Sequence, residues 1–93
     1  MKIFMIKNHM TEQIISSAGA YPSKERAYKA CYELALRRAK QAESEYPDKE
    51  VVVEREHSDF NKSDRFKAIA KNGKYEDVIA IFRVVGIQFY EEP

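Results

Sequence analysis

The longest apolar run of the chain lies near its C-terminus, between Val78 and Val85, where only Arg83 interrupts it. Many of its residues are β-branched or aromatic, which suits a β-strand. A strand with one face in water would alternate apolar and polar residues, whereas here both alternating sets are apolar. The pattern therefore predicts that residues 77–90 form a strand covered on both faces, inside a sheet or at a contact between subunits.

Three shorter stretches also have the pattern of strands. Residues 2–7 contain four consecutive apolar positions, which again indicates an interior strand. Residues 13–21 could form a second strand and a hairpin with the first, although Gly19 and several small residues weaken that pattern. Residues 50–57 begin with three valines after Glu50 and become polar, so we expect their far end to project beyond the core.

The clearest helix begins after Tyr21 and Pro22. Ser23 is a good N-cap residue, and Glu25 lies in the first turn, where a carboxylate interacts favourably with the helix dipole. Good helix formers continue from residue 24 to about residue 45. At 100° per residue one stripe of this helix is apolar and mostly small, which predicts close packing on a sheet. The stripe consists of Ala27, Tyr28, Cys31, Ala35, Ala39, Ala42 and Tyr46.

Residues 63–74 are open to two interpretations. Asn72-Gly73 is a strong signal for a type I′ hairpin turn. That register, however, would place Lys71 opposite Lys74 and would turn Asp77 toward the apolar face, and both are unfavourable. Alternatively, Ser63 caps a short helix that ends at the same Asn-Gly pair. The unfavourable hairpin pairs tip the choice slightly toward the helix.

The resulting order is strand, weak strand, long helix, strand, short helix or strand, and long strand. It predicts one α+β domain over residues 1–93, a small and mostly antiparallel sheet of three to five strands with the long helix packed on one face. The other face also needs a cover because the last strand is apolar on both sides. Residues 63–74 could supply it, or a second subunit could, which would make the chain a homodimer.

Composition and charge narrow the class of protein. The chain has 93 residues, of which 44% are hydrophobic and 33% charged, and its formal net charge is +1. These values indicate a folded domain and exclude both a polycation that coats nucleic acid and a polyanion that mimics DNA. Cys31, the only cysteine, cannot form an intramolecular disulfide. No apolar stretch is long enough for a signal-peptide core or a membrane span, so we expect a cytoplasmic protein.

Motifs for catalysis are weak. His57-Ser58-Asp59 contains residue types used in hydrolysis, but three sequence neighbours lack the geometry of a triad, whose members converge from different parts of a fold. Two histidines and one cysteine give no metal-binding framework, and nucleotide-binding glycine motifs are absent. We therefore expect a protein that is not an enzyme and that uses no cofactor or metal.

Basic residues gather in two places. Residues 62–74 carry five of them, interleaved with aromatic residues, a mixture that suits contacts with phosphates and bases or with an acidic protein. The residues expected to bind a protein partner are Phe60, Lys62, Arg65, Phe66, Lys67, Lys71, Lys74 and Tyr75. The alternative, a nucleic-acid-binding accessory protein, would use residues 62–74 together with a basic patch on the long helix formed by Arg37, Arg38 and Lys40.

The start of the helix carries the sequence Tyr-Pro-Ser-Lys-Glu-Arg-Ala-Tyr at residues 21–28, after a first strand and before further strands. In this architecture, over residues 1–56, the chain resembles small accessory proteins encoded by bacteriophages and other mobile elements, which are typically single α+β domains. The resemblance implies a protein without enzymatic activity that binds a host factor, as inhibitors of host defence do. The expectation is a small binding module that acts through a protein–protein surface.

Overall fold

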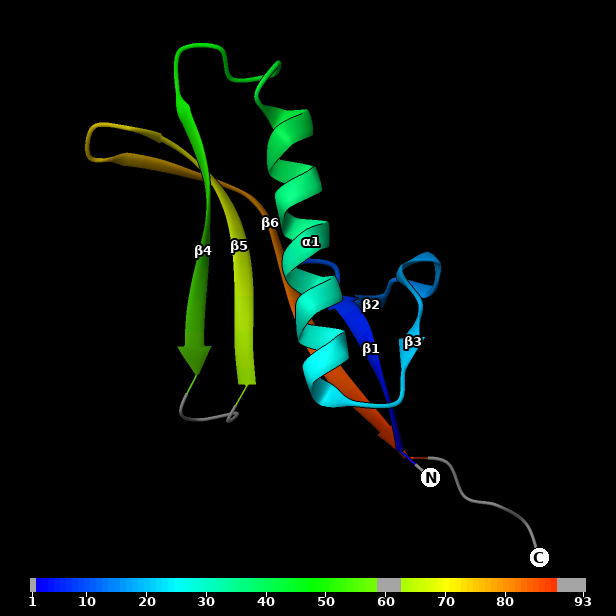
Figure 1. The fold of residues 1–93 in the computed structure, drawn as a ribbon. Coiled ribbons are helices and arrows are strands. Elements are labelled where there is room, and N and C mark those ends of the chain that lie inside the picture. The colour runs from blue at the N-terminus through cyan, green and yellow to red at the C-terminus, as the bar shows by residue number, and fades with distance from the viewer. Residues whose placement is uncertain (1, 59–62, 89–93) are drawn as a thin grey trace, which may run out of the picture.

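The chain forms one antiparallel sheet with a long helix across one face (Figure 1). This architecture is that of a computed structural model, which describes residues 2–58 and 63–88. The elements are β1 (Lys2–Asn8), β2 (Gln13–Ile14), the 3-10 helix η1 (Ser16–Ala18), β3 (Ala20–Tyr21), α1 (Lys24–Ala42), β4 (Glu50–Ser58), β5 (Ser63–Asn72) and β6 (Tyr75–Gln88). The strand order is β2-β1-β6-β5-β4, and β3 also pairs with β1. The predicted α+β fold is confirmed.

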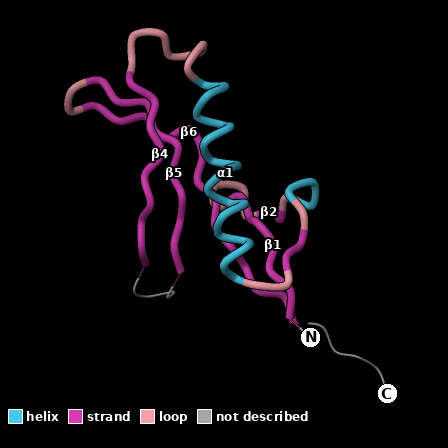
Figure 2. The backbone as a smooth tube through the Cα atoms, viewed as in Figure 1, coloured by secondary structure: helices cyan, strands magenta, loops and turns pink. Residues whose placement is uncertain are grey.

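Strand β6 lies in the middle of the sheet, as the apolar run predicted. It pairs with β1 along one side, where Ile6 lies opposite Val84, and with β5 along the other, where Phe66 lies opposite Phe82. Figure 2 shows β6 passing behind α1, with β4 and β5 on one side of the helix and β1 and β2 on the other. The helix therefore crosses the centre of the sheet, over its longest strand.

Helix α1 begins and packs as its sequence predicted. The Ser23 hydroxyl accepts a hydrogen bond from the backbone N–H of Arg26 at 3.3 Å, which caps the first turn. The buried residues of the helix all belong to the predicted stripe, and four of the five are alanines. Small side chains let the helix backbone lie close to the sheet, so the bulk of the core comes from the strands. The stripe packs around Ile6, Phe66, Phe82 and Val84.

The predicted second strand over residues 13–21 is interrupted. Strands β2 and β3 each have two residues and both pair with β1, with η1 between them. Gly19 follows η1 with φ of 95°, a left-handed value that favours glycine. Gly19, which weakened the strand pattern in the sequence, thus lies where the strand is interrupted.

Residues 63–74 form a strand and half of a hairpin, so the preference for a short helix was wrong. The loop between β5 and β6 is Gly73-Lys74, and Gly73 has φ of 62° whereas Lys74 is not left-handed. A left-handed residue at only the first loop position is typical of a type II′ turn and not of type I′. The turn therefore lies one residue later than the expected one, and Lys71 faces Glu76 instead of another lysine.

A β-bulge in the same hairpin changes which residues share a face. Ala68 lies opposite Ala80, whereas Ile69 lies opposite Val78, so Ile79 is an extra residue in β6. Successive strand residues point to opposite faces, so one inserted residue exchanges the faces of all that follow. After the bulge, the residues of β6 that face the helix are those that would face away from it in a strand without the bulge.

The bulge aligns the aromatic residues of the hairpin, and a distant lysine removes the remaining objection to it. The bulge brings Phe82 opposite Phe66, so both rings enter the core. Asp77 lies before the bulge, opposite Ala70, at the end of the sheet, and it forms an ion pair with Lys49 from the α1–β4 connection. The carboxylate near the apolar face therefore has a partner that no local pattern reveals.

The second face of the sheet is not covered by residues 63–74, because these belong to the sheet itself. Within residues 2–58 and 63–88, α1 is the helix that packs on the strands, and it lies on one side. Met5, Ile81 and Val85 on the other side are half-buried. Coverage of this side by a second subunit remains a prediction.

Cys31 offers a test of the packing of α1. Its side chain is fully buried, and burial raises the pKa of the thiol to about 12. A thiol-specific disulfide reagent should react with the native chain at least about a thousandfold more slowly than with the chain in concentrated guanidinium chloride, because opening a small domain costs about 5 kcal/mol or more. Rapid reaction of the native chain, followed by absorbance, would contradict the packing of α1.

Candidate functional site

The face of the sheet turned away from α1, here called the open face, carries a line of charged side chains across four strands. Lys7 on β1 lies opposite Arg83 on β6, and Arg83 lies opposite Arg65 on β5. Glu56 on β4 continues the line beyond Arg65. Cross-strand partners in an antiparallel pair project to the same face, so three cations lie side by side. We call Lys7, Arg83 and Arg65 the basic row.

One end of the basic row is paired with a single carboxylate. Glu12, in the turn after β1, lies 2.6 Å from Lys7 Nζ and 3.5 Å from Arg83. The hydrogen bond from Lys7 and the charge of Lys7 lower the pKa of the Glu12 carboxyl, so it is ionised at neutral pH. Two cations thus share one negative charge.

The other end of the row repeats this arrangement. Glu56 forms ion pairs with Arg65 and with Lys67, whose Nζ lies at 2.8 Å. The hydrogen bond from Lys67 is the main cause that lowers the pKa of the Glu56 carboxyl. Across the described part of the cluster four cations therefore face two carboxylates, which leaves two positive charges in excess.

His9 joins the row without adding a negative charge. Its Nε2 lies 3.1 Å from a terminal nitrogen of Arg65. A guanidinium can only donate hydrogen bonds, so Nε2 accepts, and the neutral ring carries its proton on Nδ1. His9 Nδ1 and the Nε atoms of Arg65 and Arg83 are buried and lack a hydrogen-bond partner among the described residues. The cluster therefore has more donors than acceptors.

Lys71, further along β5 on the same face, has the opposite balance. It forms an ion pair with Glu54 and lies 3.6 Å from Glu76. The hydrogen bond with Glu54 is the main cause that raises the pKa of the Lys71 ammonium group. Two carboxylates thus compensate one cation, so the excess positive charge is confined to the region of the basic row.

An apolar patch adjoins the basic row. Met5 lies opposite Val85, and Ile3 lies opposite Ile87, each two or four residues before or after the row along its strand. All four side chains are half-buried. The open face therefore combines an apolar patch (Ile3, Met5, Val85, Ile87) with an excess of cations beside it.

The structure divides the residues that the sequence predicted for partner binding. Arg65, Lys67 and Lys71 lie on the open face, whereas Phe66 is 5% exposed on the α1 face, where its ring is 6.3 Å from that of Tyr28. The remaining predicted residues lie elsewhere: Lys74 and Tyr75 are exposed at the hairpin end, and Phe60 and Lys62 fall outside the described residues.

The alternative basic patch lies on the other layer of the molecule. Arg37, Arg38 and Lys40 belong to α1, and Arg38 lies 3.7 Å from Glu45. Because α1 and the open face are on opposite sides of the sheet, the two basic groups do not form one surface. Sequence reasoning missed Lys7, His9 and Glu12, whose proximity to β5 depends on the pairing of β1 with β6. It also missed Arg83, which the pairing of β5 with β6 places opposite Arg65.

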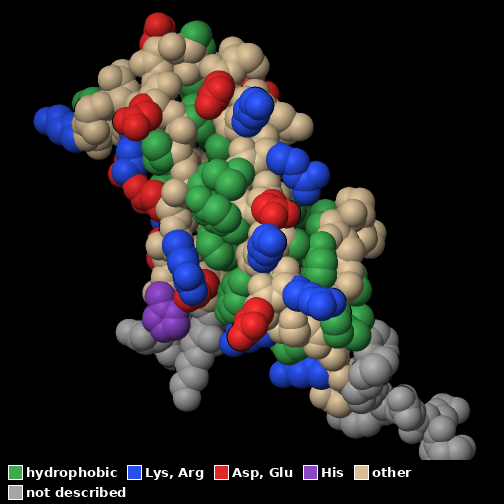
Figure 3. Space-filling model, viewed as in Figure 1, with side chains coloured by type: hydrophobic (Ala, Val, Ile, Leu, Met, Phe, Trp, Pro, Cys, Tyr) green, Lys and Arg blue, Asp and Glu red, His purple; other side chains and the backbone are tan. Residues whose placement is uncertain are grey.

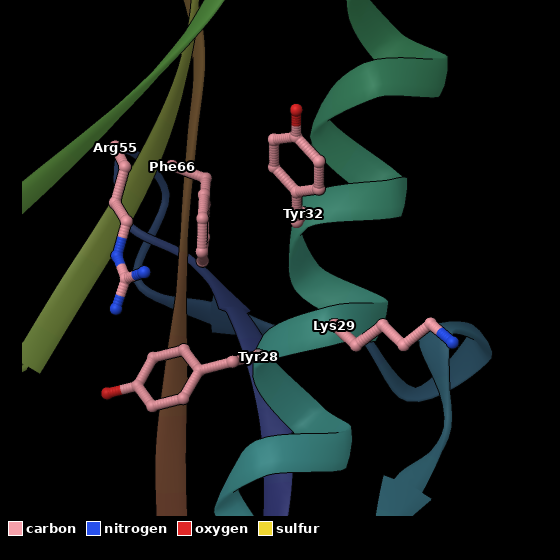
Figure 4. Close-up of a pocket in the computed structure, with 5 residues that line it drawn as sticks. All are labelled: Tyr28, Lys29, Tyr32, Arg55 and Phe66. Carbon is pink, nitrogen blue, oxygen red and sulfur yellow. The ribbon is translucent and has the colours of Figure 1, made fainter.

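A groove runs along α1 on the covered side. Figure 3 shows hydrophobic side chains gathered beside the helix, and a cavity of about 360 Å³ lies there. Figure 4 shows its lining: Tyr28, Lys29 and Tyr32 from α1, Arg55 from β4 and Phe66 from β5. The Tyr32 ring is 5.6 Å from the Phe66 ring, and the Arg55 guanidinium lies 6.0 Å from the Phe66 ring centre. The groove is therefore a place where the layer between α1 and the sheet opens to the surface.

Asp64 lies at one end of the layer between α1 and the sheet. Its carboxylate accepts hydrogen bonds from His57 Nδ1 at 2.6 Å and from Arg55 Nε at 2.7 Å, and its backbone N–H donates to the Tyr28 hydroxyl at 3.4 Å. The hydrogen bond from His57 is the main cause that lowers the pKa of the Asp64 carboxyl, with Arg55 adding to it. These contacts tie β4 and α1 to β5, a structural role for His57.

We expect Asp64→Asn to lower the free energy of unfolding by roughly 1–2 kcal/mol near neutral pH, because charge-assisted hydrogen bonds are lost. The folded-state pKa of Asp64 lies below its ordinary value of 3.8. Its stabilising effect is therefore complete above that value and is lost as pH falls through the folded pKa. Denaturant unfolding of both chains as a function of pH should show their difference narrowing only below about pH 4; a difference independent of pH would contradict this role.

Comparison of the chain with known proteins does not assign it to a family. No protein-family model matches the chain, and comparisons with curated proteins and with solved structures found no significant match. In the described part of the chain no three His, Cys, Asp or Glu residues are grouped to hold a metal ion. None of the described helices is long and apolar enough to cross a membrane.

Proposed function

We propose that this chain is a small, non-enzymatic binding module that docks a protein partner on the open face. The observation that carries the proposal is the excess of two positive charges beside an apolar patch, on a sheet face that no described helix covers. Protein interfaces combine an apolar centre with a polar rim, and complementary charge sets their specificity and association rate. The partner surface that fits is apolar with acidic groups at its margin.

Two separate sequence features support the same face. The cations of β5 were expected to bind a partner, and the uncovered side of the last strand was expected to need a cover. Arg65 and Lys67 lie beside Ile81 and Arg83 of that strand. The proposal therefore explains both features with one contact.

A second copy of the chain fits this face less well than an acidic partner. Two open faces packed together would bring two sets of uncompensated cations into one interface, and like charges in contact are costly. A face-to-face homodimer is therefore disfavoured as the main occupant.

Nucleic acid is also disfavoured on this face. The basic groups of α1 and of the open face are on opposite layers, and Phe4, Phe66 and Phe82 pack toward the helix instead of offering rings for base stacking. The resemblance to accessory proteins of bacteriophages and other mobile elements adds the class of partner to the proposal: a host factor, acted on in the cytoplasm.

The proposal predicts that Met5→Lys strongly reduces capture of the partner. Tagged chain would be used to retain proteins from a bacterial lysate after nuclease treatment. A lysine at Met5 would place a further charge in the apolar patch, and burial of an unpaired charge in an interface should reduce the retained partner about tenfold or more.

Leu36→Lys is the matched control, because Leu36 is 43% exposed on α1, on the opposite layer. It should leave capture unchanged. Loss of capture with Leu36→Lys but not with Met5→Lys would move the binding surface to the groove beside α1. Loss of all retained material on nuclease treatment would replace the proposal with nucleic-acid binding. Thermal unfolding of both variants serves as the check that they are folded.

A further inference from the structure

We propose that the basic row of the open face is a binding site for a phosphate dianion. The inference rests on the proposed function and deepens it, because it names a chemical group that the open face recognises. The site consists of Lys7, Arg83 and Arg65, with His9 and Lys67 at its margin.

The charge of the cluster sets the charge of the ligand. Glu12 and Glu56 each serve two cations, and Glu54, which lies opposite Lys67, forms its ion pair with Lys71 instead. Arg83 and Arg65 lie directly opposite each other, an arrangement that is unfavourable for like charges. A carboxylate would leave one positive charge uncompensated, whereas a phosphate monoester, with a charge of about −1.5 to −2 at neutral pH, would balance both.

The hydrogen-bond inventory points to the same kind of ligand. Three buried nitrogens of the cluster lack an acceptor among the described residues: the Nε atoms of Arg65 and Arg83 and Nδ1 of His9. All three are donors, given that His9 Nε2 accepts from Arg65. These donors add to the excess of donors over acceptors in the cluster, and a ligand made of acceptor oxygens suits such a cluster where a cation or an apolar group does not.

The row is accessible and has suitable geometry. The side chains of Lys7, Arg83 and Arg65 remain 20%, 22% and 27% exposed, so a ligand can reach them from solvent. A guanidinium presents its donors in a planar fork that matches the oxygens of phosphate, and two such groups lie on neighbouring strands. Paired strands hold these groups without the need for a loop to order on binding.

The test is titration of the purified full-length chain with inorganic phosphate at about pH 8, where phosphate is a dianion, followed by calorimetry. We expect saturable binding of one equivalent. Arg83→Gln should weaken it about tenfold or more, because one bidentate, charge-assisted contact is lost. Arg65→Gln, a second variant of the same row, should weaken it similarly.

Lys71→Gln is the matched control. It removes one positive charge from the same face and the same strand as Arg65, but from a residue already balanced by two carboxylates. It should change the affinity for phosphate less than about twofold. Equal losses from Arg83→Gln and Lys71→Gln, or acetate binding as tightly as phosphate at equal ionic strength, would overturn the proposal. Thermal unfolding shows which variants are folded, and either variant of the row suffices.

The same titration distinguishes the sources of the phosphate. A short peptide with one phosphoserine that binds about tenfold more tightly than inorganic phosphate would indicate a phosphorylated side chain of the partner; equal affinity would indicate a free phosphate. An oligodeoxythymidine that binds more tightly than both would overturn the dianion site in favour of a phosphodiester chain. If phosphate fails to bind while Met5→Lys still strongly reduces capture, the proposed function stands without this site.

Discussion

The register between β5 and β6 is the constraint on which the rest of the structure depends. Beyond the bulge at Ile79, Phe66 and Phe82 lie opposite each other on the α1 face, and Arg65 and Arg83 lie opposite each other on the open face. If the pairing of Ile69 with Val78 continued without the bulge, Phe82 would turn to the open face and Arg83 toward the helix. The core and the basic row are therefore two results of one inserted residue.

This register leaves the chain with one covered face and one open face. The small stripe of α1 lets a single helix lie close to the sheet, so the phenylalanines of the strands fill the core. By alternation along β5, Ile69 belongs to the open face, yet it is 1% exposed. It lies between Lys67 and Lys71, whose aliphatic stems can cover it while their charged ends reach water. Long charged side chains thus replace a second layer over part of this face.

The sequence predicted those features that depend on local periodicity. The N-cap at Ser23 and the buried stripe of α1 follow from residues within a few turns of one another. The hairpin did not, because its local turn signal was offset by one residue and its remaining conflict was resolved by Lys49, far along the chain. The candidate site was found in part for the same reason: Arg65 and Lys67 are sequence neighbours, whereas Arg83 and Glu12 are 71 residues apart.

The open face is where the chain departs most from rules that favour stability. Like charges lie opposite each other, three buried donors have no acceptor within residues 2–58 and 63–88, and apolar side chains remain half-exposed beside them. In a small domain, whose net stability is a small difference between large terms, each of these costs is substantial. These three departures lie together on one face, and violations concentrated in one region are typical of a functional surface. Neutral residues at Arg65 and Arg83 would relieve the repulsion on the face turned away from the core, so the presence of two guanidinium groups there argues for a ligand that uses them.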